Sequence, residues 1–181
     1  MSARAVDNCG DKIKATMARK AEISAGLLVY RRKPSLEVLL AHPGGPYWAR
    51  KDEGAWSIPK GLAEPDDDLL AAARRELAEE TGFIADGDFI ALAPVKQKSG
   101  KVVHAFALED DFDLAQFASN TFEIEWPPRS GRRRAFPEVD RIGYFGIEEA
   151  MRKILVYQQP FIRELLDKLG AVEPSDHNPR N

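Results

Sequence analysis

Cysteine and long apolar runs are nearly absent from this sequence. Its single cysteine, Cys9, has no partner within the chain with which to form a disulfide. No apolar run approaches the roughly 18 residues that a membrane-spanning helix requires, and the first residues lack the apolar centre of a signal peptide. We therefore expect an enzyme of the cytoplasm that does not associate with membranes.

The sequence also lacks an excess of positive charge. Lysine and arginine number 26 against 29 aspartates and glutamates, so the net charge is −3. This balance excludes broad nucleic-acid binding through bulk charge, although it leaves room for local basic patches. The 44% hydrophobic and 30% charged content is ordinary for a soluble globular protein. Nothing in the sequence indicates an oligomeric state.

Length and pattern together predict one folded domain. A chain of 181 residues can bury roughly two thirds of its unfolded surface in a single core. We expect residues 1–20, which show no clear period, to form a flexible extension. Residues 21–172 are expected to form the single domain. The polar, proline-containing residues 173–181 are expected to be a disordered tail.

One stretch, Gly61–Phe83, carries the strongest pattern in the chain. Pro65 suits the first turn of a helix, the aspartates at 66–68 favour its positive N-terminus, and Gly82 suits its end. Four apolar residues fall on one side of this helix: Leu69, Leu70, Ala73 and Leu77. The sequence therefore predicts an amphipathic helix.

Three glutamates lie beside the apolar stripe. Glu76, Glu79 and Glu80 are spaced i, i+3 and i+4, so they share one helix face. Like charges at this spacing destabilise a helix. Arg75 lies four residues before Glu79 and can neutralise only one of the three charges. Mg²⁺ or Mn²⁺ suits the remainder, because these hard cations take carboxylate oxygens and substrate phosphates. The alternative is a solvated acidic face.

The fixed spacing of residues in this stretch resembles the signature of a known family. Gly61 is followed by five residues, an acidic residue, seven residues, and then Arg75-Glu76-Leu77-Ala78-Glu79-Glu80-Thr81-Gly82-Phe83. This pattern resembles the Nudix box and departs from it at Asp67, where the family has glutamate. The segment Trp56–Gly61 is also similar to the entry strand and turn of Nudix enzymes that cleave diadenosine polyphosphates or RNA 5′ ends.

The resemblance implies an α/β fold, the Nudix-type α/β/α sandwich with a mixed β-sheet. It also implies a pyrophosphohydrolase that uses Mg²⁺ or Mn²⁺ to hydrolyse a phosphoanhydride bond in a nucleotide. A dinucleoside polyphosphate or a nucleoside triphosphate is the leading substrate, nucleotide sugars and RNA 5′ ends stay open, and other nucleic acid is not expected. The alternative is a non-catalytic Nudix-fold module that senses or binds a nucleotide.

Matching this sequence to the box assigns roles to individual residues. The metal ligands that the resemblance implies are Glu76, Glu79, Glu80 and the backbone carbonyl of Gly61. Glu79 shares metal binding or accepts a proton, and Arg75 orients Glu79 or Asp67 rather than touching substrate. Glu138, an acidic residue before the last expected strand, corresponds to a position that helps to hold metal or activate water in the family, with Asp140 in reserve.

Six further residues are candidates for substrate contacts: Lys60, Tyr47, Trp48, Arg50, Lys98 and Lys101. Lys60 arrives beside the box and suits a phosphate contact, against the alternative of an exposed turn lysine. Tyr47 and Trp48 lie in a long loop with Arg50, where they either stack on a nucleobase or cap an edge of the core. Lys98 and Lys101 either meet a polyphosphate tail or simply keep a hairpin tip soluble.

The rest of the chain alternates strand and helix patterns. Strands are predicted at residues 24–30, 37–42, 56–58, 89–95, 102–108, 120–126 and 142–145, and helices at residues 147–154 and 159–169. The segment Pro127–Arg134 cannot continue a central strand and is predicted to be a basic loop that either is solvated surface or steers an anionic substrate. His104 has no accompanying histidine and is expected to pack rather than bind metal.

Overall fold

The computed structural model describes residues 22–64 and 66–171. The expectations for residues 1–20, for Pro65 and for residues 173–181 lie outside these ranges. In chain order the elements are β1 (Ile23–Arg32), β2 (Leu36–Pro43), β3 (Lys60–Ala63), α1 (Leu69–Thr81), β4 (Phe89–Lys96), β5 (Val102–Glu109), η1 (Leu114–Gln116), β6 (Thr121–Glu125), β7 (Arg133–Pro137), β8 (Val139–Gly146), α2 (Ile147–Lys153), η2 (Val156–Gln158) and α3 (Gln159–Leu169).

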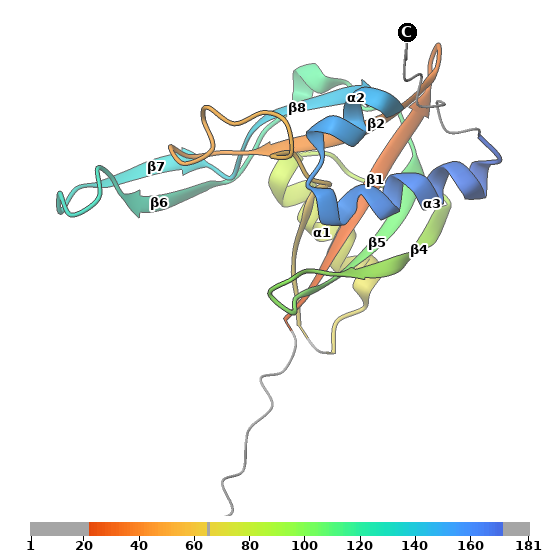
Figure 1. The fold of residues 1–181 in the computed structure, drawn as a ribbon. Helices are drawn as coiled ribbons and strands as arrows, with labels where there is room; N and C mark the ends of the chain where they lie inside the picture. Colours follow the sequence, from red (N-terminus) through yellow and green to blue (C-terminus); the bar gives the residue numbers. More distant parts are fainter. Residues whose placement is uncertain (1–21, 65, 172–181) are drawn as a thin grey trace, which may run out of the picture.

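A mixed six-stranded sheet forms the centre of the molecule (Figure 1). Its strands follow the order β4-β5-β1-β2-β8, and β3 pairs separately with β1. The β1–β5 pair is parallel, whereas β1–β2, β1–β3, β2–β8 and β4–β5 are antiparallel. The mixed sheet that the family resemblance implied is therefore confirmed.

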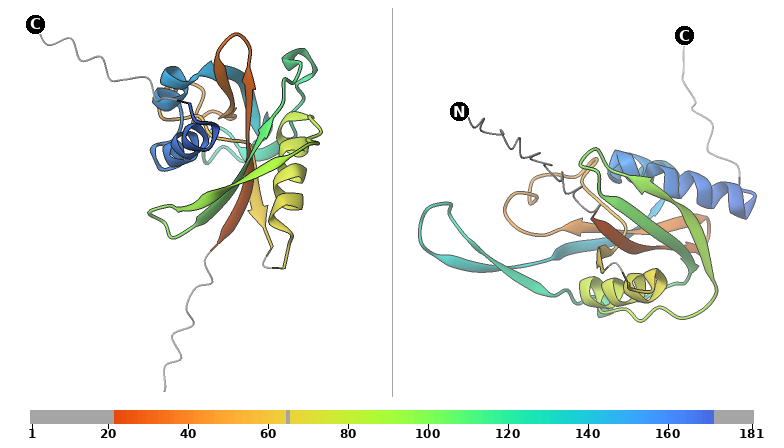
Figure 2. Two further views of the ribbon diagram at one scale, coloured as in Figure 1. Left: turned by 90° about the vertical axis from the view of Figure 1, so that its right-hand side faces the viewer. Right: turned by 90° about the horizontal axis from the view of Figure 1, so that it is seen from below.

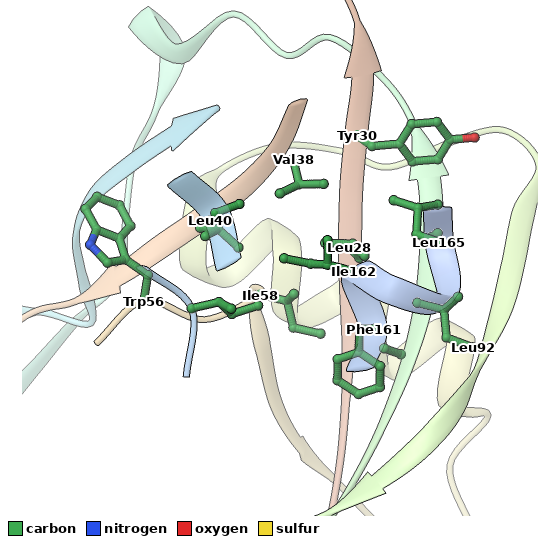
Figure 3. Packing of buried hydrophobic residues seen from close by; sticks show 14 of the residues in the cluster. Leu28, Tyr30, Val38, Leu40, Trp56, Ile58, Leu92, Phe161, Ile162 and Leu165 are labelled. Atoms are coloured by element: carbon green, nitrogen blue, oxygen red, sulfur yellow. The ribbon is translucent and has the colours of Figure 1, made fainter. Parts of the chain in front are cut away.

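Helices cover both faces of this sheet (Figure 2). Along β1, Ala25, Leu27 and Val29 pack into the cluster that includes the apolar side of α1. The intervening Leu28 and Tyr30 pack into the opposite cluster, which includes α3 residues such as Phe161 (Figure 3). Because β1 is buried on both faces, its sequence is a continuous apolar run rather than an alternation. The α/β/α sandwich is confirmed.

Helix α1 begins and ends where its own residues provide caps. The Asp68 carboxylate accepts a hydrogen bond from the backbone N–H of Ala71 at 2.9 Å, and Gly82 closes the helix with a φ of 78°. Asp66 and Asp67 precede the helix instead of forming its first turn, because Asp68 takes the capping position. The helix therefore starts later than Pro65 suggests, and the glutamates lie in its second half.

Segment 56–58, predicted to be a strand, makes only isolated bridges, Ala41 with Ser57 and Trp56 with Ile154. The physical reason lies in β1, which pairs with β3 through residues 23–26 and with β2 through residues 30–32. Segment 56–58 crosses between those two partners. The regular strand is instead β3, which begins at Lys60 and brings Gly61 alongside β1.

A second correction concerns the segment predicted to be a basic loop. Arg133 and Arg134 belong to β7, which pairs antiparallel with β6, and Phe122 lies opposite Phe136 in that pairing. The following strand, β8, begins at Val139 rather than at Ile142. The β6–β7 hairpin projects from the domain in two perpendicular views (Figures 1 and 2). No helix within the described residues is long and apolar enough to cross a membrane.

Candidate active site

The candidate site lies along the contact between α1 and β3. Gly61 on β3 faces the Glu76 side chain so closely that a Cβ atom at this position would overlap the Glu76 carboxylate. A glycine is therefore required by the close approach of strand and helix rather than by an unusual backbone angle. The Glu76 side chain is 13% exposed. The arrangement fixes one carboxylate directly over the β3 backbone.

Glu80, one turn further along α1, is the most perturbed acid of the site. Its Oε2 accepts a hydrogen bond from the backbone N–H of Lys60 at 3.0 Å. Burial raises the pKa of the Glu80 carboxyl to about 7, while the positive charge of Lys60 and the Lys60 N–H oppose this rise. The carboxylates of Glu76 and Glu138 add to the rise, so three acidic groups act on one another here.

Lys60 supplies positive charge next to these acids. Burial lowers the pKa of its ammonium, the nearby Lys101 lowers it further, and Glu80 and Glu76 raise it. Lys101 also lies 3.7 Å from the Glu22 carboxylate. Two sequence candidates for phosphate contacts, Lys60 and Lys101, are thus close enough for their charges to interact, and Lys60 also interacts with the charges of Glu80 and Glu76.

Arg75 holds the outer side of the carboxylate group. Its Nη2 donates to the backbone carbonyl of Leu62 at 3.1 Å and to Glu76 Oε1 at 3.0 Å. Its guanidinium also lies 3.7 Å from Asp67 and 3.8 Å from Glu79. Arg75 therefore connects β3, the segment before α1, and two of the three glutamates.

Asp67, the departure from the box, still reaches Arg75. Its Oδ2 lies 3.7 Å from Arg75 Nη1 and accepts the backbone N–H of Glu64 at 3.0 Å. We expect Asp67→Glu to leave kcat/KM equal or up to about threefold higher, because one more methylene shortens the approach to the guanidinium. Steady-state kinetics on the substrate that a product screen identifies measure the effect. A tenfold loss would contradict this account of Asp67.

Glu138 and Asp140 have different surroundings. The Glu138 carboxylate acts on Glu80, and its backbone N–H donates to the Asn120 carbonyl at 2.8 Å. Asp140 is instead occupied by the fully buried His42, whose Nδ1 lies 2.6 Å from Asp140 Oδ1. Of the two acids weighed from the sequence, Glu138 is the one beside the α1 carboxylates. The His42–Asp140 pair was not foreseen, because nothing in the sequence links positions 98 residues apart.

The donor set fits a hard divalent cation. Within the described ranges, no three His, Cys, Asp or Glu side chains are already gathered as metal ligands. The Glu76 carboxylate faces Arg75, and that of Glu80 faces the Lys60 amide. Glu76, Glu80 and Glu138 nonetheless offer only oxygen ligands, and Glu76 and Glu138 repel the charge of Glu80. Both features suit Mg²⁺ or Mn²⁺.

The remaining candidates lie on loops at different places. Tyr47 is 61% exposed and stands edge-on against Trp126 of the hairpin, with ring centroids 5.3 Å apart. Trp48 packs against the core and carries the Lys51 ammonium 4.4 Å from its ring centre, so it caps a core edge. Arg50 is exposed on the same loop, and Lys98 is exposed in the β4–β5 turn.

The raised pKa of Glu80 predicts a pH-dependent stability in the presence of a chelator. The pKa of Glu80 is about 7 in the folded protein and 4.5 in its ordinary state. Below pH 4.5 the carboxyl is protonated in both the folded and the unfolded protein and does not affect stability. As pH rises from 4.5 to 7, the unfolded protein loses this proton first, so the free energy of unfolding falls. The full difference corresponds to about 3 kcal/mol. Glu80→Gln should therefore melt about 5–10 °C above the unsubstituted protein at pH 8 and close to it at pH 4. Calorimetry at both pH values measures the difference in melting temperature between the two proteins. The same difference at pH 4 and pH 8 would contradict this account of Glu80.

Comparisons with known proteins agree with the geometry. A family model described as NUDIX domain matches residues 20–169. A 57-residue segment is 44% identical to the RNA pyrophosphohydrolase of Caulobacter vibrioides (strain NA1000 / CB15N) and covers 29% of this chain and 33% of that protein. Over 114 residues the chain is 27% identical to Nudix hydrolase 7 of Arabidopsis thaliana, covering 59% of this chain and 39% of that protein. The matches thus span between a third and two fifths of these relatives.

Solved structures share the fold at low sequence identity. A C. elegans Ap4A hydrolase in a binary complex superposes with a TM-score of 0.56 at 20% identity, covering 81% of this chain and 98% of that chain. The NUDIX domain of Shewanella oneidensis NrtR, complexed with ADP ribose, gives a TM-score of 0.57 at 14% identity, covering 87% and 94%. These likenesses concern the arrangement of the sheet and its helices.

Proposed function

Because the chain belongs to the Nudix family, we propose that it hydrolyses a phosphoanhydride bond in a nucleotide, with Mg²⁺ or Mn²⁺ bound at the α1 carboxylates. The observation that carries the proposal is the half-buried Glu80, whose carboxylate accepts a hydrogen bond from the Lys60 amide while Glu76 and Glu138 repel its charge. Carboxylates that repel one another in this way suit a bound cation, and such a cation also binds the phosphates of a substrate. A dinucleoside polyphosphate or a nucleoside triphosphate is the leading substrate.

Residues of both α1 and β3 would hold the cation. These are Glu76, Glu80 and the backbone carbonyl of Gly61, with Glu79 and Glu138 in supporting positions. When bound, a divalent cation neutralises phosphate oxygens and lowers the pKa of bound water. Glu79, which is half exposed beside Arg75, is suited to accept a proton from a water that approaches from solvent.

The positive side chains of the site have separate tasks in this proposal. Lys60, which is half-buried and whose charge interacts with that of Glu80, offers an ammonium to a substrate phosphate at the carboxylates, and Lys101 adds a second charge near Lys60. Arg75 positions Glu76 through a direct hydrogen bond and is engaged by protein groups rather than facing substrate. The chain thus supplies placement and charge for an in-line displacement at phosphorus.

A product screen tests the proposal. The purified protein is incubated with Mg²⁺ or Mn²⁺ and a panel of dinucleoside polyphosphates, nucleoside triphosphates, nucleotide sugars and 5′-triphosphorylated RNA, with a chelator as the control. We expect phosphate-containing products from at least one class and none with the chelator. Nucleotide-dependent protection against thermal unfolding without any product would instead favour a nucleotide sensor and overturn the proposed hydrolysis.

A further inference from the structure

The β6–β7 hairpin presents two chemically different faces. Paired residues of an antiparallel ladder point to the same side, so the register places Glu123, Glu125 and Arg133 on one face. On that face Arg133 Nε donates to Glu123 at 3.1 Å, and Glu125 accepts the backbone N–H of Gly131 at 2.7 Å. The charges of this first face are therefore engaged within the hairpin.

The opposite face, called here the arginine face, combines aromatic and cationic side chains. Its members are Phe122, Ile124, Trp126, Arg132, Arg134 and Phe136, with Trp126 and Arg132 continuing the ladder through a 2.8 Å backbone hydrogen bond. Arg132 and Arg134 are exposed, and neither forms an ion pair with an acid in the parts of the chain that the structure describes. Two guanidinium groups therefore lie among apolar side chains and have no anionic partner among the residues that the structure describes.

The loop after β2 extends this face. Tyr47 stands edge-on against Trp126 and remains 61% exposed, while Gly45 lies against the Phe122 ring. Arg50, on the same loop, is also exposed and lacks an acidic partner among the described residues. The loop and the hairpin lie side by side as they leave the domain (Figures 1 and 2).

The hairpin starts at the candidate active site. The backbone N–H of Ala118 donates to the Thr81 carbonyl at 3.0 Å, and that of Asn120 donates to the Glu79 carbonyl at 3.2 Å. At the other end of the hairpin, Glu138 is the acid that acts on Glu80. An extended ligand that lies along the arginine face would therefore lead to the carboxylates of α1.

We propose that the arginine face and Tyr47 bind a single-stranded polynucleotide. Tyr47 presents an exposed ring, and the rings of the hairpin are half-buried beside the exposed arginines. Rings that stack on bases, together with arginines that meet phosphates, are the features by which proteins hold single strands without sequence preference. An acidic peptide would use the arginines but not the rings. Since the whole chain has a net charge of −3, the attraction comes from the local positive charge of this face rather than from bulk charge. We extend the proposal by placing the 5′ phosphates of the bound polynucleotide at α1, and this extension rests on the proposed hydrolysis.

Fluorescence anisotropy tests binding independently of hydrolysis. The probe is a 3′-labelled RNA of about 12 nucleotides with a 5′-hydroxyl, which contains no anhydride bond to cleave. We expect Arg132→Ala/Arg134→Ala to weaken binding at least about tenfold and to reduce the slope of log K against log salt by about 1.4. Tyr47→Ala should weaken binding about tenfold without changing that slope. DNA of the same sequence should bind equally.

Arg133→Ala is the matched control, because Arg133 lies on the other face and is paired with Glu123. It should leave binding unchanged, and thermal melts of all variants should coincide since the side chains are exposed. Absence of RNA binding by the unsubstituted protein would overturn the proposal, as would unchanged binding by the double variant. Equal binding of poly-glutamate, insensitive to Tyr47→Ala, would assign the face to acidic proteins and also overturn it.

Discussion

Glu80→Gln is expected to lower turnover by about a thousandfold while the fold stays intact. Glutamine keeps an oxygen that can accept the Lys60 N–H, so the 3.0 Å link between α1 and β3 can persist. What disappears is the negative charge that a cation requires and that burial beside Glu76 makes costly. Single-turnover assays on the substrate identified by the screen measure the loss.

The control for this substitution is Glu148→Gln. Glu148 is an exposed acid of α2 that accepts a hydrogen bond from Arg152 Nη1 at 2.9 Å, outside the site. The Glu148→Gln substitution removes one negative charge, as Glu80→Gln does, but it leaves α1 and β3 unchanged. Its turnover should equal that of the unsubstituted protein. A Glu80→Gln protein as active as Glu148→Gln would remove Glu80 from the proposed mechanism.

Gly61→Ala is expected to lower activity by about a hundredfold, because misplacing a catalytic group by about 1 Å has effects of that size. An added Cβ would overlap the Glu76 carboxylate, so either the side chain or β3 must shift. The backbone of Gly61 needs no positive φ, so the loss would report the steric conflict rather than backbone strain. Affinity for Mn²⁺ should fall together with turnover.

Gly146→Ala provides a matched control for this effect. A Cβ at Gly146 meets no atom within 4 Å, and its φ of −58° is ordinary for any residue. Both substitutions reduce backbone freedom in the unfolded chain in the same way. Activity should be lost only at position 61, and equal activities of the two variants would show that the approach of Gly61 to Glu76 is not needed.

The central helix could be predicted because its residues carry the signal locally, whereas the sandwich was predicted from the resemblance to the Nudix box. The end of α1 at Gly82, its apolar stripe and the spacing of Glu76, Glu79 and Glu80 are all readable within one short segment. The strand pairs β1–β2 and β4–β5 follow from alternating or apolar runs around short turns. Helix α3 begins and ends at the predicted residues.

Strand β7 and the surroundings of Tyr47 and Trp48 could not be predicted in the same way, whereas β6 lies within the strand predicted at residues 120–126. Strand β7 reads Arg-Arg-Ala-Phe-Pro and shows no usable alternation, and its pairing depends on Phe122 across the turn. Tyr47 and Trp48 are adjacent and chemically alike in sequence. Only the distant contacts, Trp126 for Tyr47 and the core for Trp48, separate an exposed ring from a packed one.

Electron paramagnetic resonance of Mn²⁺ tests most directly whether the acids of α1 form a cation site. Titration of the unsubstituted protein should diminish the signal of free Mn²⁺ in a saturable way, and Glu76→Gln/Glu80→Gln should abolish that binding while the melting curve shows a folded protein. The same Mn²⁺ affinity in both proteins would place any bound cation elsewhere and contradict the proposed site.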